Sequence, residues 1–430
     1  MNKKWIGIVA IIVCLILAIF CWPQKVKLKI GIFAGSNWDV PSGDSYQVID
    51  RAIERFEKQY PDIEVVYQSG ILKEDYSLWL SSQFLEGTEP DVFLILDQDF
   101  NTLSSLGALK DLSGHMADDP NFDSKEYYKS ALESGIYQDT QYALPYESNP
   151  QLMFVNKTLL KNENIEIPDN SWTLEDFYKI CKQVTKDTNH DGIINQYGCY
   201  DFDWLDSVYS HGVQLFNEDG TECYLSQEPM KQAISFLKKL NQLNQGRTIT
   251  STEFDKGQVA FMPMPFSQYR TYMPYPWRVK KYSTFEWDCV KMPSLSKEQN
   301  MSEVSTLLMG ISSRTSYPKE SWELLKMLSY DRTTQLDLFK YSQGVSSLKT
   351  ITQSQEALSL LGEEVFGDSQ VDMSLLNDVM ENTVSHNQFK KYDSTLSLIE
   401  TKVVQIIDND DDLDTELMNL QKEINQYLNE

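Results

Sequence analysis

Closely spaced carboxylates are the first candidates for chemistry in this chain. Pairs occur at Asp97 with Asp99 and at Asp201 with Asp203, and paired carboxylates carry out acid–base work in glycoside hydrolysis. Because the chain holds 63 acidic residues, such pairs are expected by number alone. The sequence contains no nucleophile elbow, HExxH motif, phosphate-binding loop or glycine-rich dinucleotide fingerprint, and only four histidines. These features favour binding over catalysis.

A second candidate for chemistry is a loop at residues 187–198 with the spacing of a calcium loop. Its side-chain oxygens at positions one, three, five and nine belong to Asp187, Asn189, Asp191 and Asn195. Position twelve, normally a bidentate Glu, is a glycine, so a complete EF-hand is excluded. Two interpretations stay open: a possible structural calcium ion completed by carbonyls or water, and an ordinary turn rich in Asp and Asn.

Residues 142–160 would position a binding site by joining two lobes. Two apolar runs flank the polar stretch 147–150. Pro145 and Pro150 fix φ and remove backbone donors, which predicts that the chain between them leaves the sheet and crosses between lobes. The side chains of residues 146–149 would then lie at the mouth of an interlobe cleft, where small-molecule sites concentrate. A plain surface loop is the alternative.

The first hundred residues of the folded chain predict a parallel sheet. Alternating or continuous apolar runs predict strands at residues 25–33, 63–67 and 91–96, with helices from about 45 and over about 73–84 between them. Strands that alternate with helices are typical of parallel sheets with right-handed crossovers. Ligands in such sheets meet the loops at the carboxyl ends of strands. Residues 35–39 and 97–100 are two such loops.

Length and charge limit the class of protein. A chain of 430 residues is expected to form two domains. A formal net charge of −25 repels phosphate backbones and argues against a nucleic-acid partner. Four cysteines lie outside the N-terminal apolar run, and a disulfide among Cys181, Cys199 and Cys223 is as plausible as free buried thiols.

The N-terminus predicts delivery to the outside of a membrane. Lys3 and Lys4 precede an apolar run over residues 5–22, and basic residues stay inside. The length of the run favours an uncleaved membrane anchor. Two alternatives are a lipoprotein signal ending at Cys21, in which Phe20 is an atypical residue before the cysteine, and a cleaved secretory peptide. A cleaved peptide would need small residues before the cleavage site, and the sequence does not have them.

An aromatic segment at residues 266–287 is a third candidate for ligand contact. Prolines at 263, 265, 274 and 276 predict that it forms neither a regular helix nor a central strand. Aromatic side chains on irregular segments face ligands more often than those in regular elements, although most still pack in a core.

Nine landmarks in fixed order resemble the extracellular solute-binding proteins of ABC importers, in the branch that binds sugars and oligosaccharides (family 1, like maltose-binding proteins). They are residues 52–65, 89–92, 107–112, 142–157, 172–185, 212–225, 254–262, 292–293 and 322–328. The resemblance covers nearly the whole chain after the N-terminal run.

The resemblance implies an α/β fold of two lobes (class II of the periplasmic binding proteins), each a mainly parallel sheet flanked by helices. Lobe crossings are implied at residues 146–150, near 293 and at 341–348. The implied segments are 1–23 as anchor or signal, 24–146 with about 293–340 as the first lobe, and 147–292 with about 341–430 as the second.

The implied function is capture of a carbohydrate by a monomer on the outer face of the cytoplasmic membrane and its delivery to an ABC permease, without catalysis or an essential cofactor. Carrying the binding site over residue by residue implies ligand contacts at Asn37, Trp38, Asp39, Asp97, Asp99, Glu147, Asn149, Trp204, Met264, Phe266 and Tyr269. Sugars suit these residues because their apolar faces stack on aromatic rings and their hydroxyls bond to polar side chains. A binding protein or sensor for another solute, and a secreted glycosidase, are the alternatives.

Overall fold

The computed structural model describes residues 25–40, 46–217, 219–272, 285–297, 302–363, 373–383, 389–409 and 411–430. The strands of its large sheet are β1 (Val26–Gly31), β2 (Ile63–Tyr67), β3 (Val92–Ile95), β6 (Ala143–Asn156), β7 (Tyr197–Cys199), β8 (Val259–Pro265), β9 (Trp287–Val290) and β10 (Val304–Ile311). They follow the order β2-β1-β3-β10-β6-β8-β7, and β9 also pairs with β6. A separate hairpin consists of β4 (Ile136–Tyr137) and β5 (Thr140–Gln141).

The three N-terminal strands are parallel to one another, as the sequence predicts. The crossovers are α2 (Gln47–Gln59) and α3 (Lys73–Glu86). One face of α2 is apolar and buries Val48, Ile49, Ala52 and Phe56, which explains why the helix packs on the sheet. The predicted start of this helix, at about residue 45, lies outside the described residues.

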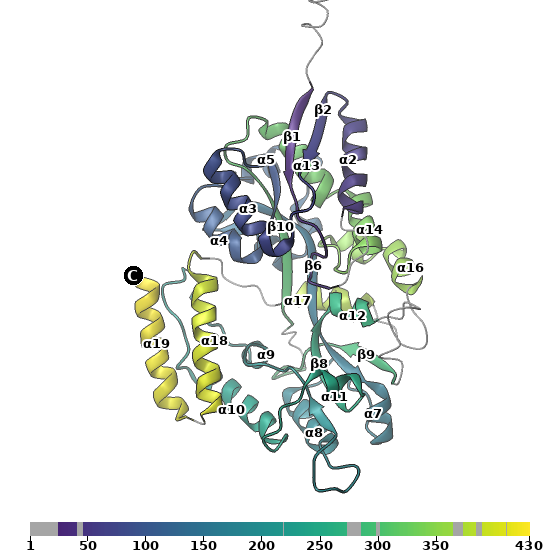
Figure 1. Cartoon of the computed structure of the whole chain (residues 1–430), viewed down its shortest axis with the longest axis vertical. Helices are drawn as coiled ribbons and strands as arrows, with labels where there is room; N and C mark the ends of the chain where they lie inside the picture. Colours follow the sequence, from purple (N-terminus) through teal and green to yellow (C-terminus); the bar gives the residue numbers. More distant parts are fainter. Residues whose placement is uncertain are drawn as a thin grey trace, which may run out of the picture.

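Strand β6 belongs to both parts of the sheet (Figure 1). Residues 143–150 pair antiparallel with β10, and residues 151–156 pair antiparallel with β8 and β9. The prediction that the chain leaves the sheet between its two prolines is therefore wrong, although β6 does link the two parts. A bulge opposite Leu307 and Leu308 interrupts the ladder beside Pro145, and Pro150 pairs with the first residue of β10.

Successive side chains of β6 enter two different apolar cores. Leu152 and Phe154 lie in the first core, whereas Met153 and Val155 lie in the second, as the alternation of a strand requires. Of the helices that follow β6, α11 (Ser251–Asp255) and α12 (Phe266–Tyr272) bury Phe254 and Phe266 in the first core. Four others pack on the second core: α7 (Lys157–Asn162), α8 (Leu174–Val184), α9 (Trp204–Ser210) and α10 (Glu228–Gln242). The C-terminal pair α18 (Tyr392–Asp408) and α19 (Leu413–Asn429) also packs on the second core.

The remaining helices surround the first core. They are α4 (Asp97–Ser105), α5 (Ser113–Asp118), the 3-10 helix η1 (Ser124–Glu126), α6 (Lys129–Glu133), α13 (Pro318–Ser329), α14 (Arg332–Tyr341), α15 (Lys349–Thr352), α16 (Gln355–Glu363) and α17 (Met373–Asn382). Val345, Leu348 and Met380 are buried in this core, and Tyr128 beside α6 donates a hydrogen bond to Asn377 of α17 (2.6 Å). Within the segment from about 341 to 430 that is expected to join the second lobe, these residues therefore pack on the first core, whereas α18 and α19 pack on the second.

Thr173 and Asp176 form a complete capping box at the start of α8. The segment around residue 265 is regular, contrary to the prediction, because Pro263 and Pro265 lie in β8 and a short helix, α12, follows directly. Within the described residues, no helix has the length and apolar character needed to cross a membrane, and the expected anchor lies outside them.

Candidate ligand-binding site

A cavity of about 470 Å³ lies where the carboxyl ends of β1, β2 and β3 meet. It is lined by Ala34, Ser36, Asp39, Val40, Leu72, Lys73, Glu74, Leu96 and Gln98. A parallel bridge between Ala34 and Leu72 extends the pairing of β1 with β2 to the cavity wall. This edge is where ligands bind in open α/β sheets, and both loops that the sequence singles out contribute to it.

Lys73, in the first turn of α3, holds the loop after β1 in place. Its Nζ donates to the backbone oxygen of Asn37 (2.8 Å) and to Asp39 Oδ2 (2.7 Å). The Lys73 side chain is 23% exposed, whereas the Asp39 side chain is 76% exposed. Asp39 also adopts a left-handed conformation with φ of 57°. The pair therefore presents a cation and a carboxylate at the cavity, where both can bond to hydroxyl groups.

Four polar lining residues are absent from the site predicted from the sequence: Ser36, Lys73, Glu74 and Gln98. A signal for Lys73 and Glu74 exists, because the helix they begin follows β2, the second strand of the same parallel group. Gln98 lies between the two predicted acids in the first turn of α4.

Glu147 is fully buried and connects three segments of the chain. Asn37 Nδ2 donates to its Oε2 (2.5 Å), and the Gly344 N–H donates to its Oε1 (2.8 Å). Burial raises the pKa of Glu147, although the side chains of Ser342, Asn37 and Trp38 and the Gly344 N–H act to lower it. Glu147 thus links β6 to the loop after β1 and to the segment after α14. From its position behind the cavity, it orients Asn37.

Trp38 packs against the first core and is only partly exposed. Its indole nitrogen is buried near Glu147 and Gly344 and has no hydrogen-bond partner of normal geometry. The side chain does not line the cavity. Its predicted stacking on a ligand stays a prediction.

Asn149 is buried and bonds to the first turn of α12. Its Nδ2 donates to Ser267 Oγ (3.0 Å), and the Ser267 N–H donates to its Oδ1 (2.9 Å). Both polar groups of the side chain are therefore used by the protein. Like Glu147, Asn149 braces the chain where it passes from one part of the sheet to the other.

Asp97 and Asp99 lie in the first turn of α4, which faces the second part of the molecule. Ser77 Oγ donates to Asp99 Oδ2 (2.6 Å). Burial raises the pKa of Asp99, and the nearby Asp393 of α18 raises it further. Figure 1 shows α4 above the N-terminal end of α18. The two predicted acids thus lie where the two parts of the molecule meet.

The four predicted site residues of the second part are packed inside the protein. Trp204, Met264, Phe266 and Tyr269 are each at most 4% exposed. The rings of Phe266 and Tyr269 stack with centroids 5.7 Å apart, and Tyr269 meets Trp287 edge-on at 4.8 Å. None of the four lines the cavity at β1–β3, so their role as ligand contacts stays a prediction.

The oxygens of the predicted calcium loop accept hydrogen bonds from their own backbone. Asp187 accepts from the N–H groups of His190 (2.8 Å) and Gly192 (2.7 Å), and Asn195 accepts from that of Thr188 (2.9 Å). Asn189 Nδ2 donates to Asp191 (2.9 Å). The described residues include no cluster of three or more His, Cys, Asp or Glu suited to a metal. This network fits the turn interpretation, and calcium binding stays a prediction.

Of the two interpretations of the cysteines, free buried thiols is the one confirmed. Cys181, Cys199, Cys223 and Cys289 are all buried and unpaired with one another. Burial raises the pKa of the Cys181 thiol, which keeps it protonated and unreactive.

The fold and the cavity together define an α/β binding protein of two lobes joined through β6. The family model described as bacterial extracellular solute-binding protein matches residues 51–359, and the chain belongs to this family. Both the fold class and the family predicted from the sequence are confirmed.

Solved structures with this fold include three sugar-binding proteins. An ABC substrate-binding protein of Listeria monocytogenes in complex with cycloalternan is 18% identical, with a TM-score of 0.71, and the match covers 94% of this chain and 99% of that one. The sugar-binding protein MalE of Xanthomonas citri is 14% identical with a TM-score of 0.75 and coverage of 94% and 97%. The cyclic α-maltosyl-1,6-maltose binding protein of Arthrobacter globiformis is 13% identical with a TM-score of 0.75 and coverage of 94% and 99%. No curated protein sequence matches the chain.

Proposed function

We propose that this protein captures a sugar or oligosaccharide between its two lobes outside the cell and delivers it to an ABC permease. The observation that carries the proposal is the polar cavity at the carboxyl ends of β1–β3, beside the α4 turn that faces α18. Lys73, Asp39 and Gln98 offer donors and acceptors together, which is what a hydroxyl-rich ligand requires. The carbohydrates named for the similar structures support the same ligand class.

The proposal includes a membrane tether and a monomeric state. The basic residues and apolar run at the N-terminus support tethering on the outer face, either as an uncleaved anchor or through Cys21 as a lipoprotein. The extracellular setting of the family agrees with this location. A tethered protein needs no partner copy to reach a permease in the same membrane.

A thermal-shift screen tests the ligand class. Maltose, maltotriose, maltoheptaose and cyclic oligosaccharides are compared with amino acids, dipeptides and organic acids. A ligand at 100 times its dissociation constant stabilises the protein by about 2.7 kcal/mol, so one of the saccharides should raise the melting temperature. A shift with another solute class alone would replace the proposal with the non-sugar alternative, and turnover of a chromogenic glycoside would replace it with the glycosidase.

A matched pair of variants ties the shift to the cavity. Lys73→Met should abolish or strongly reduce the ligand-induced shift, because it removes a lining donor and frees the loop that the donor holds. Lys125→Met removes the same charge at an exposed site outside the cavity and should leave the shift unchanged. Equal effects of the two variants would place the ligand elsewhere.

A further inference from the structure

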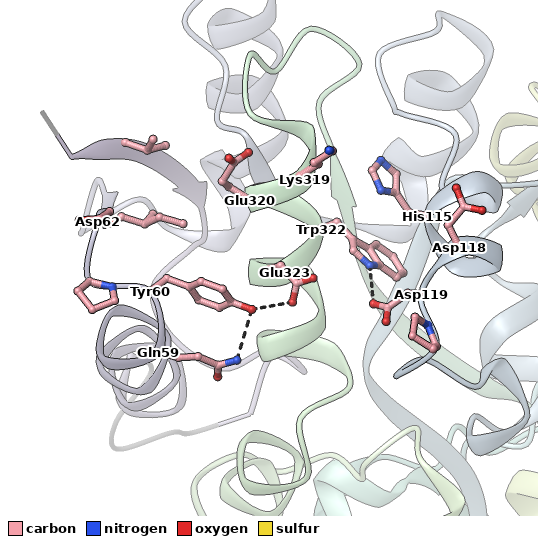
Figure 2. Close-up of a pocket in the computed structure, with 14 residues that line it drawn as sticks. Gln59, Tyr60, Asp62, His115, Asp118, Asp119, Lys319, Glu320, Trp322 and Glu323 are labelled. Carbon is pink, nitrogen blue, oxygen red and sulfur yellow. Dashed lines mark hydrogen bonds between the residues drawn. The ribbon is translucent and has the colours of Figure 1, made fainter. Parts of the chain in front are cut away.

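A larger cavity, of about 850 Å³, lies at the opposite edge of the same sheet (Figure 2). Val26 and Ile63, the first residues of β1 and β2, line it. Since β1 is six residues long, this edge is roughly 20 Å from the candidate ligand site. This cavity, the groove, is therefore separate from that site.

Three segments form the walls of the groove: the end of α2 with residues 61–62, the end of α5 with residues 119–120, and the first turns of α13. Hydrogen bonds hold these segments together (Figure 2). Tyr60 OH donates to Glu323 Oε2 (2.9 Å), and Trp322 Nε1 donates to Asp119 Oδ2 (3.0 Å). The His115 ring stacks on Trp322 with centroids 5.6 Å apart. Contacts within the protein therefore hold the walls of the groove together without a bound partner.

The charges that line the groove are mostly negative. Five carboxylates and one lysine line it: Asp62, Asp118, Asp119, Glu320, Glu323 and Lys319. Burial and the nearby Lys110 lower the pKa of His115, so this ring adds no positive charge at neutral pH. A phosphate or an anionic lipid surface would meet repulsion here.

Three of the five carboxylates are available to a partner. Asp119 and Glu323 already pair with Lys326 behind the wall. Asp62, Asp118 and Glu320 form no ion pair with a described residue. Asp62 and Asp118 are exposed and Glu320 is half-buried. Ionised carboxylates only accept hydrogen bonds, so a matching partner must bring donors.

We propose that this groove binds a lysine- or arginine-bearing polypeptide segment of a partner protein. The free carboxylates accept from the cationic groups, and arginine pairs with them in bidentate geometry. The apolar walls formed by Tyr60, Pro61 and Pro120 suit the methylene stems of such side chains. The groove lies beside the start of β1, so the proposed tether would place it at the membrane-proximal end, within reach of the external loops of membrane proteins.

Fluorescence anisotropy with a fluorescein-labelled hexa-arginine peptide tests the groove, with hexa-glutamate as the negative probe. The variant that combines Asp62→Asn, Asp118→Asn and Glu320→Gln should weaken hexa-arginine binding at least tenfold at 150 mM salt. The control combines Glu166→Gln, Glu222→Gln and Glu400→Gln, three exposed acids outside the groove, and should change binding less than twofold. Equal weakening would attribute binding to the net charge of the chain and overturn the proposal, as would no binding to the wild type.

Two further measurements separate this site from the ligand site. Saturating maltoheptaose should not displace the peptide, and displacement would assign the groove to saccharides instead. The groove variant should retain the wild-type circular dichroism melt and the wild-type thermal shift with saccharides. A peptide failure together with an intact sugar shift would reject the groove and leave the proposed function standing.

Discussion

Glu147 shows that the contacts of a polar residue singled out by the sequence can come from distant segments of the chain. Its carboxylate is fully buried and accepts hydrogen bonds from Asn37 and Gly344. Those donors come from segments 110 residues before it and 197 residues after it. The polar character of residues 147–149 was visible in the sequence, but these partners were not, because they depend on the tertiary arrangement.

A pH-dependent stability difference is expected for Glu147→Gln. Burial raises the folded-state pKa of Glu147 above its ordinary value of 4.5, so the folded protein holds this proton more tightly than the unfolded chain does. The free-energy cost of burying the charged carboxylate is therefore fully present above the pKa of the folded state. It is lost as the pH falls from that pKa toward the pKa of the unfolded chain. Relative to the Gln variant, the wild type should gain stability between pH 7 and pH 4.5, as measured by urea unfolding at both values.

The exposed Glu166 provides the control for this pH effect. The difference in unfolding free energy between the wild type and Glu166→Gln should stay nearly constant over the same pH range. A wild-type advantage over Glu147→Gln that shrinks on acidification would mean that the hydrogen bonds to Glu147 outweigh its burial.

At the scale of elements, local patterns identified the N-terminal part of the fold well, up to β3. The alternating apolar residues of β1, the run in β3 and the amphipathic face of α2 are local signals, and the parallel order of β1–β3 follows from the helices between them. The same reasoning failed at β6, where Pro145 and Pro150 indicated an exit from the sheet. The partner strand β10 lies about 160 residues later, and the bulge that β6 forms opposite Leu307 and Leu308 accommodates Pro145 in a way that local sequence does not reveal.

The segment after α14 packs tightly beside β6, and one glycine makes this possible. The Ser148 N–H donates to the Val345 oxygen (2.9 Å), and the Val345 N–H donates to the Ser148 oxygen (2.7 Å). A Cβ added to Gly344 would lie 2.5 Å from both Glu147 Oε1 and Trp38 Nε1. Gly344→Ala should therefore destabilise the protein by about 1–3 kcal/mol in urea unfolding, as overpacking does.

Gly114→Ala is the matched control for that substitution. A Cβ at Gly114 would meet no atom within 4 Å, and the residue lies in α5. This variant should leave stability unchanged or raise it by up to about 1 kcal/mol. Equal stability of the two variants would show that the segment after α14 shifts to make room for a Cβ at little cost. That result would contradict the view that this segment braces β6.

At the scale of the whole molecule, the two apolar cores share β6, whose side chains alternate between them. The candidate site lies on the first lobe, at a sheet edge near which α4 meets α18. Closure of two lobes around a ligand by a hinge at such a strand is a familiar mode of binding. The buried state of Trp204, Phe266 and Tyr269 could not be inferred from their sequence, because exposure of an aromatic ring depends on how the lobes are packed.

Contact between the lobes should respond to pH through Asp99 and Asp393. Burial raises the pKa of both carboxyls, and Asp393 also raises that of Asp99. The arrangement in which they face each other therefore binds protons more tightly, and acidification from pH 7 to 5 should favour it. Asp393→Asn removes one of the two charges and should favour the same arrangement already at pH 7, by about 0.2–1 kcal/mol.

Small-angle scattering of the ligand-free variant should give a smaller radius of gyration than the wild type at pH 7 and a weaker change on acidification. Glu400→Gln replaces an exposed acid on the same helix and should behave as the wild type. If Asp393→Asn instead has the same radius of gyration and the same pH dependence as the wild type, these two acids do not determine how closely the lobes approach each other.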